Sequence, residues 1–93
     1  MPHRLLDPRI RLRHVSCFLE VARLGSVVRA GEALGMTQPG VSRTLKELEE
    51  ILGLALFDRS RRSLTLTAFG DIFLRHAGLS IAALRQGVEA LDQ

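Results

Sequence analysis

Apolar residues recur at helical spacing along the first half of the chain, in segments that end at glycines. The first segment predicts a helix over 9–24, whose apolar stripe consists of Leu12, Val15, Leu19 and Ala22, with Phe18 beside it. Gly25 ends this pattern. The residues before it, 1–8, carry charge and two prolines without periodicity, so they are expected to form a flexible arm.

The next two segments predict a pair of helices separated by a short turn. Over 26–35, Ser26 is placed as N-cap of a stripe formed by Val27, Ala30 and Leu34. Over 37–52, Thr37 is placed as N-cap of a stripe formed by Val41, Leu45, Leu48 and Leu52. Gly35 supplies the left-handed residue that a helix C-terminus often needs. Together these features predict a helix-turn-helix at about 27–46.

After the third segment the pattern changes to that of a short β-hairpin over 56–66. The stretch Leu64–Leu66 alternates between apolar and polar side chains, and a polar run with Arg59, Arg61 and Arg62 occupies the tip. In a helix-turn-helix protein such a hairpin is called a wing, and it usually lies near the sugar-phosphate backbone.

A long helix over 67–91 is predicted next, with Thr67 as its N-cap and Asp71 in its first turn. Its later apolar residues follow a seven-residue repeat, the period of a coiled-coil seam. The candidate dimerisation residues are Ala77, Ile81, Leu84, Val88 and Leu91. Because a helix this long has little of a small domain to pack against, the seam predicts a partner helix, most simply that of a second copy.

Length and composition are those of one small domain with a modest core. The chain has 93 residues, of which 46% are hydrophobic. We expect the winged helix-turn-helix over 9–66, followed over 67–93 by the long last helix, which would serve as a linker and dimerisation helix. The formal net charge is +3, and Lys46 is the only lysine among 13 cationic residues. Arginine suits bidentate contact with phosphate or guanine, although a GC-rich genome would also enrich it.

The residue types and their pattern exclude several kinds of functional site and of cellular location. Cys17 is its only cysteine and lies within an apolar pattern, so a buried structural thiol and a reducing compartment are expected. The polar N-terminus and the lack of an apolar run of about 20 residues predict a cytoplasmic protein without a membrane segment. His3, His14 and His76 are too scattered for zinc, and no catalytic constellation is present. We expect no metal, no cofactor and no enzymatic activity.

One ordered set of motifs spans the helix-turn-helix, the hairpin and the start of the last helix. It consists of Ala30-x-x-x-Leu34-x-x-Thr37-Gln38-Pro39-x-Val41-Ser42-Arg43-x-Leu45-x-x-Leu48-Glu49, then Leu52-Gly53-x-x-Leu56-Phe57-x-Arg59, then Leu66-Thr67-x-x-Gly70. These motifs resemble the N-terminal DNA-binding domain of LysR-type transcriptional regulators. The likeness covers roughly residues 9 to 92, and Gln-Pro followed by Val-Ser is its most specific part.

The resemblance implies a mostly α fold, a winged helix-turn-helix with a two-stranded β wing and a long C-terminal linker helix. It also implies a homodimer with antiparallel linker helices that binds an interrupted palindrome in double-stranded DNA, and a higher oligomer in the full-length protein. Family members continue into an effector-binding domain of two α/β lobes, where a small-molecule inducer binds. We expect this chain to be the DNA-binding part, with that domain absent.

A narrower likeness and two departures accompany the family pattern. The closing segment FLRHAGLSIAALRQGVEAL resembles the PcaQ-type branch, which controls protocatechuate catabolism, and it implies an activator of aromatic-acid catabolic genes. Gly31 and Gly40 stand where the family usually has alanine or another small side chain. Closer helix packing at Gly31, close approach of the backbone to DNA at Gly40, and simple drift are the open explanations.

The candidate DNA-binding residues come from the polar face of the second helix of the pair, from the wing and from family positions. The set is Thr37, Gln38, Pro39, Ser42, Arg43, Lys46, Arg59, Arg62 and Arg13. Glutamine at 38 suits an adenine edge, and Ser42 faces the same way toward a base or a phosphate. Arg43 suits a guanine or a phosphate, or instead pairs with Glu47 at i+4. Lys46 contacts the DNA backbone or is simply solvated.

The wing and the first helix are expected to hold the DNA backbone. By the family pattern, Arg59 and Arg62 contact phosphate or the minor groove and Arg13 contacts a phosphate, whereas Arg61 has a larger chance of being solvated. The alternative function class is a protein-interaction winged-helix module without sequence-specific DNA binding. Such a docking face should expose aromatic or aliphatic anchors, and the polar first turn after Thr37 offers none.

Overall fold

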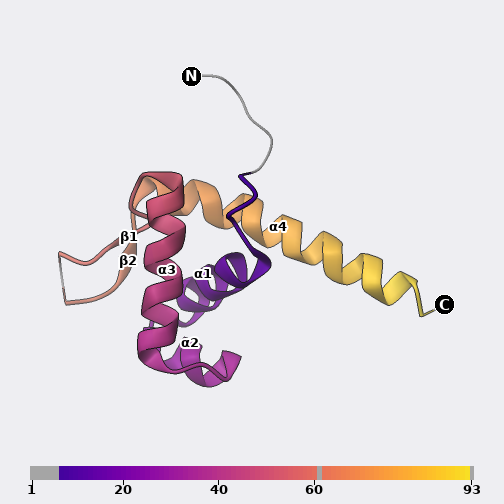
Figure 1. Cartoon of the computed structure of the whole chain (residues 1–93), viewed down its shortest axis with the longest axis horizontal. Helices are drawn as coiled ribbons and strands as arrows, with labels where there is room; N and C mark the ends of the chain where they lie inside the picture. Colours follow the sequence, from indigo (N-terminus) through magenta and orange to yellow (C-terminus); the bar gives the residue numbers. More distant parts are fainter. Residues whose placement is uncertain (1–6, 61, 93) are drawn as a thin grey trace.

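The chain folds into a small helical bundle from which a wing and a long helix project (Figure 1). The computed structural model describes residues 7–60 and 62–92. Along these residues the elements are α1 (Leu12–Leu24), α2 (Val27–Leu34), α3 (Gln38–Leu52), β1 (Phe57–Asp58), β2 (Thr65–Leu66) and α4 (Ala68–Ala90). The two strands pair antiparallel, with Phe57 opposite Leu66 and Asp58 opposite Thr65. The predicted fold class, a mostly α winged helix-turn-helix with a long C-terminal helix, is confirmed.

Helix α1 begins at Leu12, later than the predicted start at residue 9. The Asp7 carboxylate accepts a hydrogen bond from the Arg9 backbone N–H at 2.9 Å, and the Asp7 carbonyl accepts one from the Ile10 N–H at 3.0 Å. These bonds hold residues 7–10 in a turn that is incompatible with helix. The expected arm at 1–8 falls mostly on residues outside the described ones.

The buried face of α1 is rotated from the predicted stripe. Leu12 is 58% exposed, whereas Cys17, Phe18 and Val21 are buried, together with His14. The remaining predicted members are partly buried: Val15, Leu19 and Ala22. The reason is that α1 packs against α2, α3 and α4 at once, so its buried surface is wider than one stripe and is centred elsewhere.

Phe18 joins three parts of the fold at the centre of the core. Its ring centroid lies 5.4 Å from that of Phe57 in the wing and 5.2 Å from that of Phe73 in α4, both in tilted or edge-on geometry. On α3 the predicted stripe is buried at Val41, Leu45 and Leu48. The core therefore fixes the positions of α3, the wing and the first part of α4 relative to α1.

The turn between α2 and α3 requires a very close approach of two backbone segments. Gly35 has a left-handed φ of 68°, and the Met36 N–H donates to the Gly31 carbonyl at 2.8 Å. A Cβ added to Gly31 would lie 2.6 Å from the Met36 carbonyl oxygen, closer than real Cβ atoms come. Of the open explanations for Gly31, the structure therefore supports close packing.

Helix α4 is anchored at its start and free of the bundle at its end. The Thr67 hydroxyl accepts from the Gly70 N–H at 3.0 Å and donates to the Ala55 carbonyl at 2.7 Å, which ties the helix to the chain before β1. Ala77 is its last buried side chain, and residues 83–92 are all exposed. Among the described helices, none is long and apolar enough to cross a membrane.

Candidate nucleic-acid interface

Helix α3 presents a polar face to solvent on the side opposite its buried stripe. Gln38, Ser42, Arg43 and Lys46 are all exposed, as is Pro39 in the first turn. Thr37 precedes them, and its hydroxyl oxygen accepts a hydrogen bond from the Gly40 N–H at 3.1 Å. The hydroxyl of Thr37 therefore serves to start the helix. The sequence-predicted candidates on α3 do share one accessible face.

The exposed cations fall into two groups according to their partners within the chain. The paired group consists of Arg9 with Asp7 at 2.8 Å, Arg23 with Glu20 at 2.7 Å, and Arg59 with Glu49 at 3.1 Å. The second group has no ion pair within residues 7–60 and 62–92, and its members include Arg11, Arg13, Arg43, Lys46 and Arg62. The charge of a cationic side chain that pairs with no carboxylate of its own chain is not neutralised, so it can attract an external anion at full strength.

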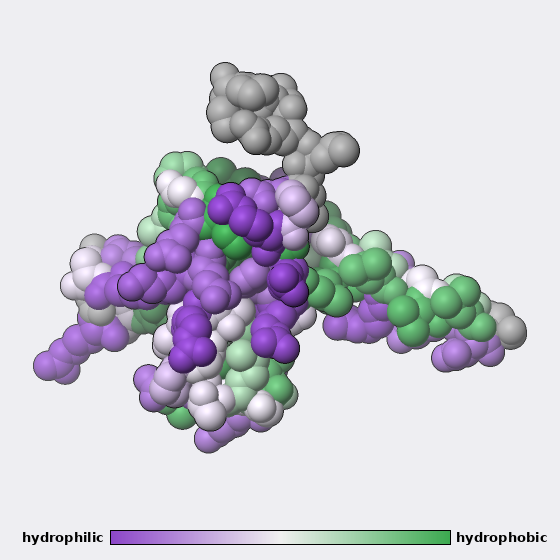
Figure 2. Space-filling model, viewed as in Figure 1, coloured by the Kyte–Doolittle hydropathy of each residue, from purple (hydrophilic) through white to green (hydrophobic). Residues whose placement is uncertain are grey.

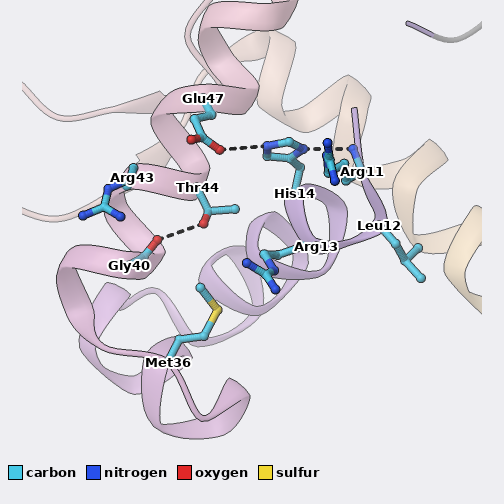
Figure 3. A pocket seen from close by; sticks show the side chains of 9 residues that line it. All are labelled: Arg11, Leu12, Arg13, His14, Met36, Gly40, Arg43, Thr44 and Glu47. Atoms are coloured by element: carbon cyan, nitrogen blue, oxygen red, sulfur yellow. Dashed lines mark hydrogen bonds and ion pairs between the residues drawn. The ribbon is translucent and has the colours of Figure 1, made fainter. Parts of the chain in front are cut away.

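A cleft of about 670 Å³ opens between the first turn of α1 and the middle of α3 (Figure 3). We call it the α1-side cleft. Its lining includes Arg11, the N-cap residue before α1, together with Arg13 from α1 and Arg43 from α3, and Glu47 is its acidic residue. Figure 3 shows Arg13 extending from α1 into the space between the two helices, whereas Arg43 leaves α3 on its outer side. The structure thus brings two predicted DNA-binding residues, Arg13 and Arg43, to one cleft.

His14 forms a bridge at the back of this cleft. It is only 5% exposed, and its Nδ1 accepts the Arg11 backbone N–H at 2.9 Å. With Nδ1 as acceptor, the neutral ring carries its proton on Nε2, which lies 3.2 Å from Glu47 Oε1. His14 therefore fixes the start of α1 to α3, and Glu47 bonds to His14 instead of to Arg43.

A second cleft, of about 350 Å³, lies between α3 and the wing. We call it the wing-side cleft. Ser42 and Lys46 line it from α3 and Arg59 lines it from the wing. Three of the sequence-predicted residues therefore gather here. Arg62 is exposed further along the wing, and Arg61 lies outside the described residues.

Arg59 is held in place by the protein itself. Its Nη2 lies 3.1 Å from Glu49 Oε1, its Nη1 donates to the Phe57 carbonyl at 3.4 Å, and its guanidinium carbon lies 5.9 Å from the centroid of the Phe57 ring. The Arg59 side chain is nevertheless 48% exposed. It borders the α3 face with its charge already balanced by Glu49, in contrast to Arg62.

Two residues that organise the interface were missed by the sequence reasoning. His14 was considered only as a metal ligand, and Glu49 only as a member of the family-like motif. For Glu49 a signal existed, since the family-like motif contains both Glu49 and Arg59. For His14 the signal was weaker, namely a polar ring three residues after the N-cap Arg11. Within the described residues, no group of three or more histidines, cysteines or carboxylates is arranged to hold a metal ion.

The predicted seam of α4 divides between the core and the surface. Ala77 is buried within the protomer, because α4 packs on α1 at that point. Ile81 is half-buried, and Leu84, Val88 and Leu91 are 54%, 63% and 83% exposed. We call Ile81, Leu84, Val88 and Leu91 the apolar strip. Figure 2 shows hydrophobic surface along the projecting part of α4, next to a hydrophilic side.

Comparison with known families decides the classification. The model of the bacterial regulatory helix-turn-helix proteins, lysR family, matches residues 12–71. The chain belongs to this LysR family. The match runs from the start of α1 into the first turn of α4, so it includes the helix-turn-helix and the wing.

Curated relatives of the chain are named as transcriptional regulators. The HTH-type transcriptional regulator PcaQ of Agrobacterium fabrum is 46% identical over 89 residues, which is 96% of this chain and 29% of the relative. The HTH-type regulator YdcI of Escherichia coli K12 is 48% identical over 89 residues, with the same coverage. The chain spans about 29% of the length of these relatives. These names agree with the expectation that the chain is not an enzyme.

Solved structures of the same fold include complexes with DNA. The structure of the BenM_DBD/benA site 1 DNA complex superposes with a TM-score of 0.85 at 31% identity, covering 89% of this chain and 93% of that chain. That of Vibrio fischeri DarR in complex with DNA superposes with a TM-score of 0.82 at 26% identity, covering 89% of this chain and 28% of that chain. The present chain therefore has the fold of a LysR DNA-binding domain.

Proposed function

We propose that this chain reads a specific sequence in double-stranded DNA by placing α3 in the major groove. The observation that carries the proposal is the exposed face of α3, where Gln38 and Ser42 offer hydrogen-bonding groups and Arg43 and Lys46 have no internal ion pair. The major groove admits one helix, and amide and guanidinium groups suit its base edges. BenM, CbnR and DarR, whose structures resemble this one, have been solved with DNA.

We propose a division of labour within the interface that the position of each side chain supports. Gln38 and Ser42, with Arg43, face the base edges, and Pro39 gives an apolar neighbour to a thymine methyl. Arg62 on the wing holds the backbone. Arg59, whose charge is balanced by Glu49, positions the wing and contributes less to phosphate binding. Lys46 contacts the backbone beside the wing-side cleft.

A comparison of two alanine variants tests this division. Gln38→Ala should lose about 1–3 kcal/mol of discrimination at one base position. Arg62→Ala should weaken binding to all sequences alike and lower the slope of log K against log salt by about one unit per chain. Selection of binding sites from a random duplex pool, followed by salt titration, measures both. If Arg62→Ala alters the preferred sequence and Gln38→Ala does not, the division is reversed. Binding without salt dependence would contradict the proposal and favour a protein-docking module.

We further propose that two copies bind an interrupted palindrome together. The apolar strip on α4 is continuous at helical spacing, and in a lone protomer its members Leu84, Val88 and Leu91 are exposed to water. Pairing of two such helices in antiparallel orientation would cover it and would set the two α3 helices on half-sites near a whole number of DNA turns apart. In the full-length protein, a higher oligomer and an inducer site would belong to the part of the relatives that this chain does not span.

We also propose which genes are regulated. The likeness to PcaQ supports a role in the cytoplasm of a bacterium as an activator of genes for protocatechuate or related aromatic-acid breakdown. A footprint upstream of a ring-cleavage operon, together with loss of that operon's induction in a deletion strain, is the expected result. Footprints confined to unrelated promoters would remove this narrower role.

A further inference from the structure

His14 joins two parts of the fold that are distant in the sequence, and both of its ring nitrogens have partners. The ring is only 5% exposed. Its Nδ1 accepts the backbone N–H of Arg11, the N-cap residue of α1, at 2.9 Å, and its Nε2 lies 3.2 Å from Glu47 Oε1 on α3. Figure 3 shows the ring between these two partners. The first contact holds the segment before α1, and the second holds α1 against α3.

The two contacts depend on the charge of the ring in opposite ways. A neutral imidazole can accept at Nδ1 and donate from Nε2, whereas a protonated imidazole carries a hydrogen on both nitrogens. The Nδ1 hydrogen of a protonated His14 would point at the Arg11 N–H, so two donors would face each other and this bond would be lost. The contact of Nε2 with Glu47 would instead become a charge-assisted hydrogen bond, which is stronger. Protonation therefore removes one contact of the ring and strengthens the other.

The charged groups around the ring decide which partner a protonated His14 keeps. Those that line the α1-side cleft are Arg11, Arg13, Arg43 and Glu47. Glu47 is the only carboxylate in this set, and its side chain is 53% exposed. In the segment before α1, Asp7 pairs with Arg9 at 2.8 Å. From α2 and α4, which also pack on α1, no charged side chain within the described residues forms a hydrogen bond or an ion pair with His14. Glu47 is therefore the group that stabilises the charged ring.

We propose that His14 is a pH-sensitive switch at the start of α1. With a neutral ring, His14 caps α1 and holds the segment 7–11 to the helix. With a protonated ring, it releases the Arg11 N–H and stays bound to Glu47. Histidine takes up a proton between about pH 8 and 5, so acidification through this range loosens the segment before α1 while α1 remains attached to α3. The switch acts through contacts within one chain, and it does not depend on the proposed DNA binding.

The first experiment follows the Arg11 amide and the His14 ring by NMR of the isotope-labelled chain, as the pH is lowered from about 8 to about 5. The Arg11 amide proton should shift upfield, because it loses its acceptor, and it should do so with the same midpoint as the His14 ring resonances. The Gly40 N–H is the internal control, because it donates to the Thr37 hydroxyl, which does not titrate, at 3.1 Å. Far-UV circular dichroism confirms that the helices persist over the range.

The second experiment repeats the titration with matched variants. In His14→Gln the third residue of the helix still offers an acceptor to the N-cap N–H but does not titrate, so the Arg11 amide shift should not change with pH. In Glu47→Gln the carboxylate that stabilises the charged ring is gone, so the joint transition should move to lower pH. Glu50→Gln, at an exposed neighbour that does not line the cleft, should leave the transition where it is.

The outcomes are independent of those for DNA binding. If the Arg11 amide does not follow the His14 ring, or if it shifts equally in His14→Gln, His14 is not a switch and the DNA-binding proposal is unaffected. If the chain fails to bind DNA, the switch can still be observed. Should His14→Gln not fold, the comparison of Arg11 with Gly40 in the unmodified chain decides.

Discussion

Glu49 on α3 holds Arg59 in the wing through an ion pair with 3.1 Å between Oε1 and Nη2. The same carboxylate accepts the backbone N–H groups of Leu56 at 2.7 Å and Phe57 at 3.1 Å. Its side chain is only 12% exposed, so these bonds are largely shielded from water. One carboxylate thus sets where the wing leaves α3, and it couples the helix that we propose to read bases to the wing that we propose to hold the DNA backbone.

Replacing Glu49 with alanine should destabilise the fold by about 1–3 kcal/mol, because two buried amide donors lose their acceptor. Glu49→Gln keeps an acceptor oxygen and should cost less. Urea unfolding followed by far-UV circular dichroism measures the loss, since the chain has no tryptophan or tyrosine. Glu50→Ala is the matched control, because Glu50 is its exposed neighbour on α3. Equal stability of the Glu49 and Glu50 variants would show that the carboxylate does not anchor the wing.

Alanine at Gly31 should destabilise the protein even though alanine favours helix. The gain in helix propensity is about 0.5–1 kcal/mol, but the added Cβ would lie 2.6 Å from the Met36 carbonyl oxygen and force the turn between α2 and α3 to move. Gly87 in α4 has nothing within 4 Å of an added Cβ, so Gly87→Ala should be stabilising by about that propensity gain. Thermal unfolding of the two variants gives the comparison. A stabilised Gly31→Ala would mean that the turn relaxes at little cost.

Glutamate at both Ile81 and Leu84 should convert the chain to a folded monomer that binds one half-site weakly. The two added charges would lie within the apolar strip, where pairing would have to remove them from water. Sedimentation with and without a duplex of two half-sites measures the assembly. As control, glutamate at Ala83, an exposed α4 residue outside the strip, should leave dimerisation intact. If the unmodified chain is monomeric on the two-half-site duplex, without cooperativity, the strip is not a dimer interface.

Cys17 should make the stability depend on pH only in the alkaline range. Burial raises the pKa of its thiol above the ordinary 9.0, outweighing a hydrogen bond with Thr44 and the charge of Arg13, which both lower it. In the unfolded chain the thiol ionises at its ordinary pKa, whereas in the folded chain it stays protonated. The free energy of unfolding should therefore be unaffected by this group below about pH 9 and fall above it. Urea unfolding of the unmodified chain and of Cys17→Ala across this pH range measures the effect, and Cys17→Ala should lack this part of the decline. If the free energies of unfolding of the two chains fall in parallel with pH, the Cys17 thiol does not cause the decline.

The helices and the wing could be predicted from the sequence because each is encoded locally. Apolar spacing marked the buried face of α3, and Ser26, Thr37 and Thr67 marked helix starts that the structure confirms with hydrogen bonds to backbone N–H groups. The start of α1 was placed too early because the Asp7 turn depends on local hydrogen bonds to its carboxylate and its carbonyl, which hydrophobic periodicity does not register.

The organisation of the interface was less predictable, because it depends on pairs distant in the sequence. His14 and Glu47 are 33 residues apart, and Glu49 reaches Leu56, Phe57 and Arg59 across the end of α3. Such contacts leave no periodic pattern. A heptad repeat likewise cannot tell whether a residue packs on its own core, as Ala77 does, or faces outward, as Val88 does.

The outer part of α4 has a thermodynamic consequence for how the molecule assembles. Residues 83–92 are all exposed in the part of the chain that the structure describes, so this segment of the helix depends mainly on its own backbone hydrogen bonds. Isolated helices shorter than about 12–15 residues are marginal in water. In a lone protomer this segment would fray, and pairing with a second copy would order it. Folding of the segment and dimerisation would then form one coupled equilibrium. Only the paired state would hold the two α3 helices at a fixed distance and so require a fixed spacing between the two DNA half-sites. Because pairing depends on protein concentration, selectivity for operators with that spacing would depend on protein concentration as well.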